Sequence, residues 1–279
     1  MPLIYLNCSD NQLTQLPNMP RLAELYCGFN MHIQLPDITN IIKLSCNNSG
    51  LTQLPDMPQL THLNCNNNDL TQLPNMPQLI YLDCSFNQLT QLPDMPFLIE
   101  LDCKYNQLTQ LPNLSNVVKL ICSGLSITQL PNMPRIINLE CDNTQLTQLP
   151  NMPHLTRLLC VNNCLTHLPD MPQMTYLSCI NNQLTQLPNI PQITHLLCGN
   201  NKLTQLPHMP YLTELKCDNN QLTQLHDMLR LVILLCSGNC ITQLPVMPQL
   251  TYLVCFNNQL TQLPNMPQLK YLRCDTTVI

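Results

Sequence analysis

The chain repeats one pattern of nineteen residues from one end to the other. The stretch LTQLPNMPQLIYLDCSFNQ, residues 70–88, is followed directly by LTQLPDMPFLIELDCKYNQ, residues 89–107. The leucine that opens the Leu-Pro pair of each copy recurs every nineteen residues from Leu16 to Leu263, without insertion or deletion. A fixed period of this length predicts a solenoid, in which each copy forms one coil that packs only against its neighbours.

One segment of each copy has the alternating pattern of a β-strand. In YLDCS, Leu82 and Cys84 alternate with Tyr81, Asp83 and Ser85, which indicates a strand with one buried face. A single short strand cannot bury that face alone, so successive copies are expected to pair in a parallel sheet. The sequence therefore predicts a single curved parallel β-sheet of about 15 strands, lying on the concave face of a solenoid. Asn87, at the end of its strand, fits a position whose side-chain amide satisfies backbone groups of the adjacent turn.

The return segment of each copy, as in LTQLPNMPQ, is too short and too rich in proline for a helix. Pro74 and Pro77 fix φ near about −65° and remove two amide donors, which favours an extended, polyproline-like path. We expect Leu70, Leu73 and Met76 to point inward from it. The predicted architecture has an extended convex side, a shallow curve and essentially no α-helix. It forms one domain over residues 1–279, with 14 full repeats, a partial one and no separate caps.

The frame L-x-x-L-x-C-x-x-N-x-L-T-x-L-P-x-M-P-x closely resembles the leucine-rich repeat, whose signature is L-x-x-L-x-L-x-x-N/C-x-L. Its L-P-x-x-P ending resembles the short bacterial type of repeat found in secreted effectors. Similar arrays are also encoded by giant DNA viruses of amoebae. This resemblance covers essentially the whole chain and implies a leucine-rich repeat solenoid that binds other proteins, with a host-directed role in a virus or bacterium.

Composition excludes several classes of partner. The formal net charge of −5 provides no basic surface, which disfavours nucleic acid and anionic membranes.

No apolar run approaches the ~20 residues that span a bilayer, and the start, MPLIYLNCSDNQ, lacks the basic region and long apolar core of a signal peptide. The expected location is intracellular: cytoplasmic, or the host cytoplasm for a viral protein.

The sequence contains no group of residues that suggests catalysis. The seven histidines are scattered over different edges of the predicted coil, and there is no Gly-rich phosphate loop. No C-x-x-C pairs or clustered histidines suggest a zinc site. We expect a protein that is not an enzyme and has no metal and no cofactor.

Cysteine occupies the sixth position of all fifteen copies, while the residue before it varies widely. We call this set the cysteine column: Cys8, Cys27, Cys46, Cys65, Cys84, Cys103, Cys122, Cys141, Cys160, Cys179, Cys198, Cys217, Cys236, Cys255 and Cys274. A buried thiol behaves as a small hydrophobe, and a larger leucine here would overpack a thin core. Packing is the favoured interpretation. A ladder of thiols that binds soft metal ions, or forms disulfides between coils, remains the alternative.

Two further cysteines, Cys164 and Cys240, occupy the tenth position of their copies, which is usually glutamine and should face outward. They lie 76 residues apart, which is four whole copies, so they are too far apart to join each other. They are either tolerated surface thiols or possible intermolecular thiols.

Some copies depart from the pattern. His32 replaces the usual leucine in NMHIQLP, and Leu125 replaces the usual asparagine in CSGLSIT. The copy LTQLHDMLR loses both prolines, to His226 and Leu229, but no residue is inserted, so the coil should continue through it. These departures have two interpretations: random sequence drift, or a contact with another protein.

The outward strand positions vary most between copies, so specific recognition is expected there. A stripe of apolar and aromatic residues at these positions suggests a partner-binding surface: Leu159, Val161, Tyr176, Ile180, Leu197, Ile233, Leu235, Tyr252, Val254 and Phe256. The first hypothesis is a non-enzymatic protein–protein interaction scaffold that binds a protein partner through the concave face. The second is a structural protein, a homo-oligomer that assembles through uncapped solenoid ends or surface cysteines.

Overall fold

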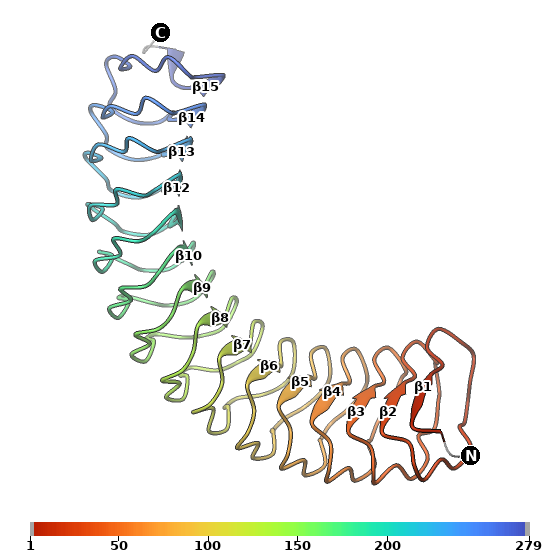
Figure 1. Ribbon diagram of the computed structural model, residues 1–279. Helices are drawn as coiled ribbons and strands as arrows, with labels where there is room; N and C mark the ends of the chain where they lie inside the picture. The colour runs from red at the N-terminus through yellow and green to blue at the C-terminus, as the bar shows by residue number, and fades with distance from the viewer. Residues whose placement is uncertain (1–2, 277–279) are drawn as a thin grey trace. The chain divides into compact units, whose positions relative to one another are not determined.

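The computed structural model describes residues 3–276, and the chain divides into two compact units, Met1–Ile136 (unit 1) and Ile137–Ile279 (unit 2). Each unit is a stack of coils in which every coil contributes one short strand to the same side (Figure 1). The organisation of residues 1–279 as one domain stays a prediction.

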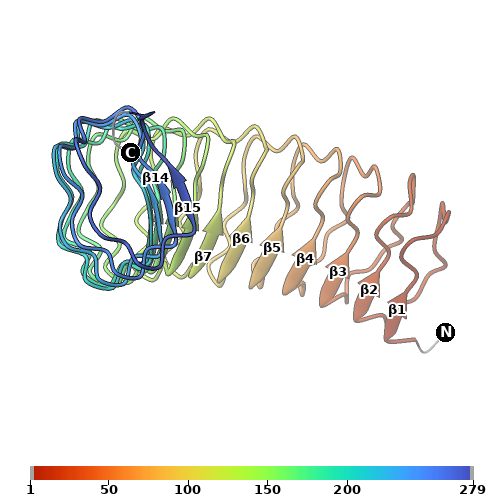
Figure 2. The same cartoon turned by 90° about the horizontal axis from the view of Figure 1, so that it is seen from above.

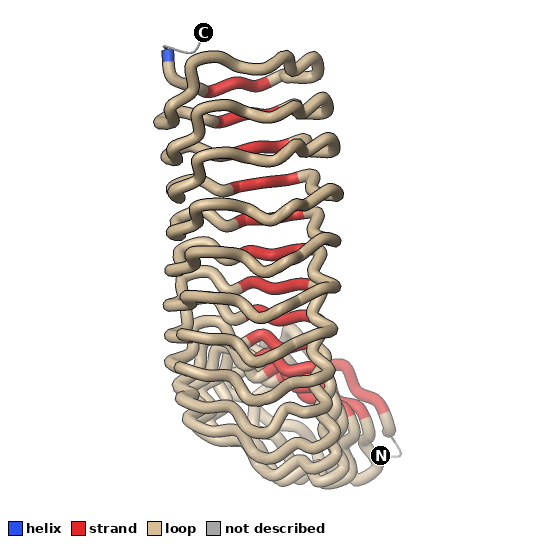
Figure 3. The backbone as a smooth tube through the Cα atoms, turned by 90° about the vertical axis from the view of Figure 1, so that its left-hand side faces the viewer, coloured by secondary structure: helices blue, strands red, loops and turns tan. Residues whose placement is uncertain are grey.

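Each strand is three residues long and corresponds to one copy of the repeat. Unit 1 contains β1 (Tyr5–Asn7), β2 (Glu24–Tyr26), β3 (Lys43–Ser45), β4 (His62–Asn64), β5 (Tyr81–Asp83), β6 (Glu100–Asp102) and β7 (Lys119–Ile121). Unit 2 contains β8 (Asn138–Glu140), β9 (Arg157–Leu159), β10 (Tyr176–Ser178), β11 (His195–Leu197), β12 (Glu214–Lys216), β13 (Ile233–Leu235), β14 (Tyr252–Val254) and β15 (Tyr271–Arg273). Figure 3 shows the strands of unit 2 aligned one above another, with loops forming most of each coil.

Within each unit, neighbouring strands pair in parallel with an offset of nineteen residues, so that leucine lies beside leucine. Leu6 pairs with Leu25 in unit 1, and Leu177 pairs with Leu196 in unit 2. Seen from above, the coils of unit 2 nearly superimpose, as expected for copies of equal length (Figure 2). The predicted parallel strands and extended return segments are confirmed, and no α-helix occurs in residues 3–276. That part of the chain accordingly has no helix with the length and hydropathy needed to cross a bilayer.

Leucine and cysteine side chains fill the middle of each coil. Leu177 and Cys179 are both fully buried, as the alternation predicts. From the return segment, Leu70 and Met76 are also fully buried, whereas Leu73 is only half-buried. Thirteen cysteines of the column are buried, and the first and last, Cys8 and Cys274, are partly exposed. The core is therefore a continuous row of leucine and thiol groups along each unit.

Burial changes the acidity of these thiols. Desolvation raises the pKa of Cys179 from 9.0 to about 12, and it raises the pKa of Cys46 well above its ordinary value. The physical cause is that a thiolate in an apolar interior loses its hydration. The buried column is thus held in the neutral thiol form, which suits packing.

An asparagine near the end of most strands joins adjacent coils. The Asn87 Oδ1 atom accepts a hydrogen bond from the Leu70 N–H at 3.0 Å, and the Nδ2 atom donates to the carbonyl oxygens of Cys65 and Cys84 at 3.0 and 3.1 Å. These bonds satisfy backbone groups that the turn would otherwise leave buried without partners. The role predicted for Asn87 is confirmed.

The two departures from the pattern have different consequences. His32 lies exposed with φ of 71°, and the next residue, Ile33, takes the buried place with 3% exposure. Leu125 is itself buried and fills the asparagine position with an apolar side chain that cannot bond the neighbouring backbone. The coil that contains His226 and Leu229 also continues as predicted, because β12 before it pairs in register with β13 after it.

Candidate protein-interaction face

The ten predicted partner-binding residues all lie in unit 2 and face outward from its sheet. Seven of them are strand residues, on β9, β10, β11, β13 and β14. Val161, Ile180 and Phe256 lie just beyond the ends of their strands. Each of the ten residues alternates with a buried leucine or cysteine. Because successive side chains of a strand point to opposite faces, these ten side chains point away from the core.

The register shows that this apolar stripe is interrupted. Leu159 pairs with Ser178, and Ser178 pairs with Leu197. Leu197 in turn pairs with Lys216, which pairs with Leu235. The predicted residues therefore form two separate groups. The β9–β11 patch contains Leu159, Val161, Tyr176, Ile180 and Leu197, and the β13–β14 patch contains Ile233, Leu235, Tyr252, Val254 and Phe256.

A charged row on and just after β12 separates the two patches. The Lys216 Nζ atom lies 2.7 Å from the Glu214 Oε1 atom. The Asp218 Oδ1 atom accepts a hydrogen bond from the Ser237 N–H at 3.0 Å. Burial raises the pKa of Asp218 above its ordinary value. A partner that spans both patches must therefore also satisfy a polar strip between them.

Stacked aromatic and cationic side chains flank the patches. The Arg157 guanidinium carbon lies 4.1 Å from the centroid of the Tyr176 ring, and the Tyr176 and His195 rings stack at 5.8 Å. Tyr252 and Tyr271 stack face to face at 4.2 Å. Such pairs hold large side chains in fixed positions, which suits them as contact residues.

Sequence reasoning missed Arg157, His195 and Arg273 as members of this surface. The Arg273 guanidinium carbon lies 4.8 Å from the Phe256 ring centroid, beside a residue that was predicted. The signal that could have found these residues is the nineteen-residue offset. It places Arg157 and His195 beside Tyr176, and Arg273 beside Val254, so each lies next to a predicted residue in the adjacent coil.

The apolar residues are less exposed than a stripe facing water would be. Tyr252 is 37% exposed and Val254 only 9%, and the other eight are half-buried. The face is therefore a broad, shallow surface that suits a macromolecular partner. Within residues 3–276, no group of three or more His, Cys, Asp or Glu side chains is placed to hold a metal ion.

The two additional cysteines lie on the surface of unit 2. Cys164 and Cys240 are both exposed, as their position in the repeat predicts. Each backbone N–H donates to a leucine carbonyl oxygen of the preceding coil at 2.9 Å, Cys164 to Leu146 and Cys240 to Leu222. Their backbones are thus fixed while their thiols are accessible. A crosslink through them stays a prediction.

Three solved structures are similar to this chain over nearly all of its length. YopM, a leucine-rich effector protein from Yersinia pestis, is 29% identical, with 98% of this chain and 89% of YopM covered and a TM-score of 0.81. A leucine-rich repeat protein of Leptospira interrogans is 26% identical, with 97% of this chain and 83% of that chain covered and a TM-score of 0.84.

The third is the functional domain of InlJ from Listeria monocytogenes, which includes a cysteine ladder. It is 30% identical, with 98% of this chain and 68% of that chain covered and a TM-score of 0.87. The cysteine column described above is a feature of the same kind. No protein-family model and no curated protein sequence matches the chain.

Proposed function

The chain belongs to the leucine-rich repeat family, and on this premise we propose that it is a non-enzymatic scaffold that binds a protein partner through the sheet face of unit 2. The observation that carries the proposal is the pair of apolar patches, β9–β11 and β13–β14, at positions that the core does not require to be apolar. Outward positions elsewhere in the same sheet hold serine, lysine and glutamate.

The composition of the two patches supports this role. Aromatic residues and arginine are enriched at the centres of protein interfaces, and charged rows at their edges set orientation. Tyr176 beside Arg157, and Phe256 beside Arg273, supply this combination in each patch. The ion pair of Glu214 and Lys216 lies between them.

We further propose that the partner is a protein of a host organism. The support is the similarity to YopM, which is an effector protein, over 98% of this chain. The sequence resemblance to short bacterial repeats and to viral arrays points the same way. The identity of the partner does not follow from the fold.

The test is an affinity capture from a host-cell extract with the wild-type protein and with a double variant, Leu197→Asp plus Leu235→Asp. Each substitution places a carboxylate in the centre of one patch without touching the buried side chains. The double variant should capture at least about tenfold less of the partner than the wild type does, because a desolvated, unpaired charge opposes binding.

The matched control changes the same outward position on two strands of unit 1, Ser45→Asp plus Asn64→Asp. It should retain the partner, and both double variants should unfold at temperatures close to that of the wild type. Capture of the same partner by wild type and by Leu197→Asp plus Leu235→Asp, at equal yield, would refute the proposed face.

A second candidate function is self-assembly, which the exposure of both Cys164 and Cys240 favours. Size-exclusion chromatography with light scattering, with and without reductant, separates the two. Covalent assembly predicts a larger species that reductant converts to monomer, and Cys164→Ser plus Cys240→Ser should remain monomeric. Growth that reductant does not reverse would instead indicate end-to-end association of the solenoid.

A further inference from the structure

Unit 1 carries a surface feature that the proposed function does not use. In coil after coil, the residue two positions after the column cysteine has a positive φ, and most residues at this place are asparagine or glycine. Phe86 and Tyr105 have φ of 53° and 51° at this position. A bulky side chain is disfavoured in this left-handed region, so the aromatic residues are not there because the backbone prefers them.

The two rings form an exposed pair. The Phe86 and Tyr105 ring centroids lie 4.8 Å apart at an interplanar angle of 26°, and each residue is 47% exposed. In the next coil, Gly124 occupies the same position, and a Cβ atom there would lie 2.5 Å from the Tyr105 ring. Glycine thus leaves the space that the tyrosine ring needs.

The stacking is not required to join the coils. At the same position in other coils, asparagine side chains link neighbours directly: the Asn162 Nδ2 atom donates to the Asn143 Oδ1 atom at 2.7 Å, and the Asn181 Nδ2 atom donates to the Asn162 Oδ1 atom at 2.6 Å. Asparagine both tolerates the left-handed backbone and makes this bond. An aromatic pair in its place forgoes both advantages.

A hollow of 380 Å³ adjoins the pair, lined by Asn66, Asn67, Asp83, Ser85, Phe86 and Lys104. This volume lies at the lower end of the range of about 300–1,000 Å³ that is usual for small-molecule sites. One wall is the Phe86 ring, and the other walls are polar. Together, Phe86, Tyr105 and the hollow are called the aromatic site.

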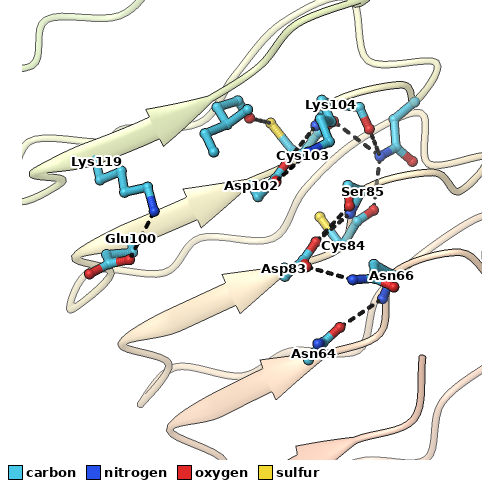
Figure 4. A network of polar contacts seen from close by, with 12 residues as sticks. Asn64, Asn66, Asp83, Cys84, Ser85, Glu100, Asp102, Cys103, Lys104 and Lys119 are labelled. Atoms are coloured by element: carbon cyan, nitrogen blue, oxygen red, sulfur yellow. Dashed lines mark hydrogen bonds and ion pairs between the residues drawn. The ribbon is translucent and has the colours of Figure 1, made fainter. Parts of the chain in front are cut away.

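The polar groups of the aromatic site are held in place by one another, as Figure 4 shows for the residues at the ends of β5 and β6. The Asp83 Oδ2 atom accepts from the Asn66 Nδ2 atom at 2.7 Å, and the Asp83 Oδ1 atom accepts from the Ser85 Oγ atom at 2.7 Å. The Lys104 Nζ atom lies 3.1 Å from the Asp102 Oδ2 atom. These groups retain further donor and acceptor capacity for a ligand.

The charges in the aromatic site select against ionic ligands. The hollow is lined by one carboxylate, that of Asp83, and by one ammonium group, that of Lys104. The Lys104 ammonium pairs with the Asp102 carboxylate and lies 5.7 Å from the Phe86 ring centroid. An anion would meet the Asp83 carboxylate, and a cation would meet the ammonium group beside the ring. The arrangement favours an uncharged ligand that has one apolar face and several hydroxyl or amide groups.

We propose that the aromatic site binds a neutral saccharide, one sugar ring of which lies against Phe86 while its hydroxyl groups bond Asn66, Asp83 and Lys104. Tyr105 does not line the hollow but stacks on the Phe86 ring and holds it in place. A pyranose ring has a C–H face that packs on an aromatic ring and a rim of hydroxyl groups that both donate and accept. The fixed carboxamide, carboxylate and ammonium groups complement that rim.

The test uses two soluble neutral oligosaccharides, cellohexaose and N-acetylchitohexaose, with saturation-transfer NMR and calorimetric titration. The wild type should bind at least one of them, with saturation transferred to the ring C–H protons of the sugar. The variant Phe86→Asn plus Tyr105→Asn, which restores the residue used by other coils, should bind at least about tenfold more weakly. Its melting temperature should equal or exceed that of the wild type, because asparagine is better tolerated at positive φ.

The matched control is Phe29→Asn, the same substitution at the same repeat position, where φ is 57°. This residue does not line the hollow, so saccharide binding should be unchanged. Absence of wild-type binding to both oligosaccharides at about 10 mM would overturn the proposal. Equal binding by wild type and Phe86→Asn plus Tyr105→Asn would also overturn it, as would binding of an aromatic probe such as adenosine with no binding of either sugar.

Discussion

Raising the pH to about 10 is expected to unfold the protein cooperatively, even with reductant present. The reason is the row of buried thiols. Desolvation raises the pKa of Cys27 and Cys179 to about 12, from an ordinary value of 9.0, and it raises the pKa of Cys198 well above that ordinary value. An unfolded chain exposes these thiols to water, where they ionise at their ordinary pKa.

The direction follows from the protons that each state holds. Below pH 9.0 both states keep the thiol protons, and stability does not depend on them. Between pH 9.0 and about 12 the unfolded state releases protons that the folded state retains, so the free energy of unfolding falls as pH rises. At pH 10 each such thiol contributes a loss of about 1.4 kcal/mol. The twelve buried thiols whose pKa is raised together contribute a loss on the order of 10–20 kcal/mol, which is as large as the typical stability of a domain.

Circular dichroism against pH measures this transition, and its steepness reports how many protons are released. A variant that replaces three neighbouring buried thiols, Cys179→Ala, Cys198→Ala and Cys217→Ala, should show a shallower transition. Replacing the exposed pair, Cys164→Ala plus Cys240→Ala, should leave the steepness unchanged. A protein that stays folded at pH 11, or a triple variant as steep as the wild type, would contradict the expectation.

The second large effect is expected from Asn182→Ala. The Asn182 Oδ1 atom accepts from the Leu165 N–H at 3.0 Å, and the Nδ2 atom donates to the carbonyl oxygens of Cys160 at 2.8 Å and Cys179 at 3.2 Å. Alanine would leave the buried Leu165 N–H without its partner and would remove one of two hydrogen bonds to each carbonyl oxygen. The Cys160 oxygen would keep the Asn163 Nδ2 donor at 3.3 Å, and the Cys179 oxygen would keep the Asn201 Nδ2 donor at 2.9 Å. We expect a loss of about 2–4 kcal/mol in the free energy of unfolding, measured by urea denaturation.

The matched control is Asn181→Gly, one residue earlier. Asn181 is exposed and has φ of 55°, and its side chain donates to another exposed asparagine, Asn162. Glycine keeps the left-handed backbone, so the change should stay within about 0.5 kcal/mol. Similar losses for Asn181→Gly and Asn182→Ala would show that the buried asparagine does not join the coils as described.

The core and the strands could be predicted from the sequence because both follow from one period. The alternation around Leu82 and Cys84 determines which side chains are buried, and nineteen residues without insertion determine the register. The role of Asn87 followed from its place at the strand end, where backbone groups need partners. Each of these depends on local pattern alone.

The surface could be predicted only in part. The apolar residues were predicted to form one stripe, which overlooked their neighbours Ser178 and Lys216. These two residues become apparent only when adjacent coils are compared side by side. The aromatic site was not found because Phe86 and Tyr105 stand where most copies carry asparagine or glycine, and nothing in the period reports a left-handed backbone. The room that Gly124 leaves for the Tyr105 ring is likewise a contact between coils.

The most direct test of the coiled core is alkylation of the native, reduced protein with iodoacetamide, read at each cysteine by peptide mass spectrometry. Cys164 and Cys240 should react fastest, Cys8 and Cys274 more slowly, and the thirteen buried column cysteines only after unfolding. Rapid alkylation along the whole column in the folded protein would mean that the thiols face water, and the coil described here would be wrong.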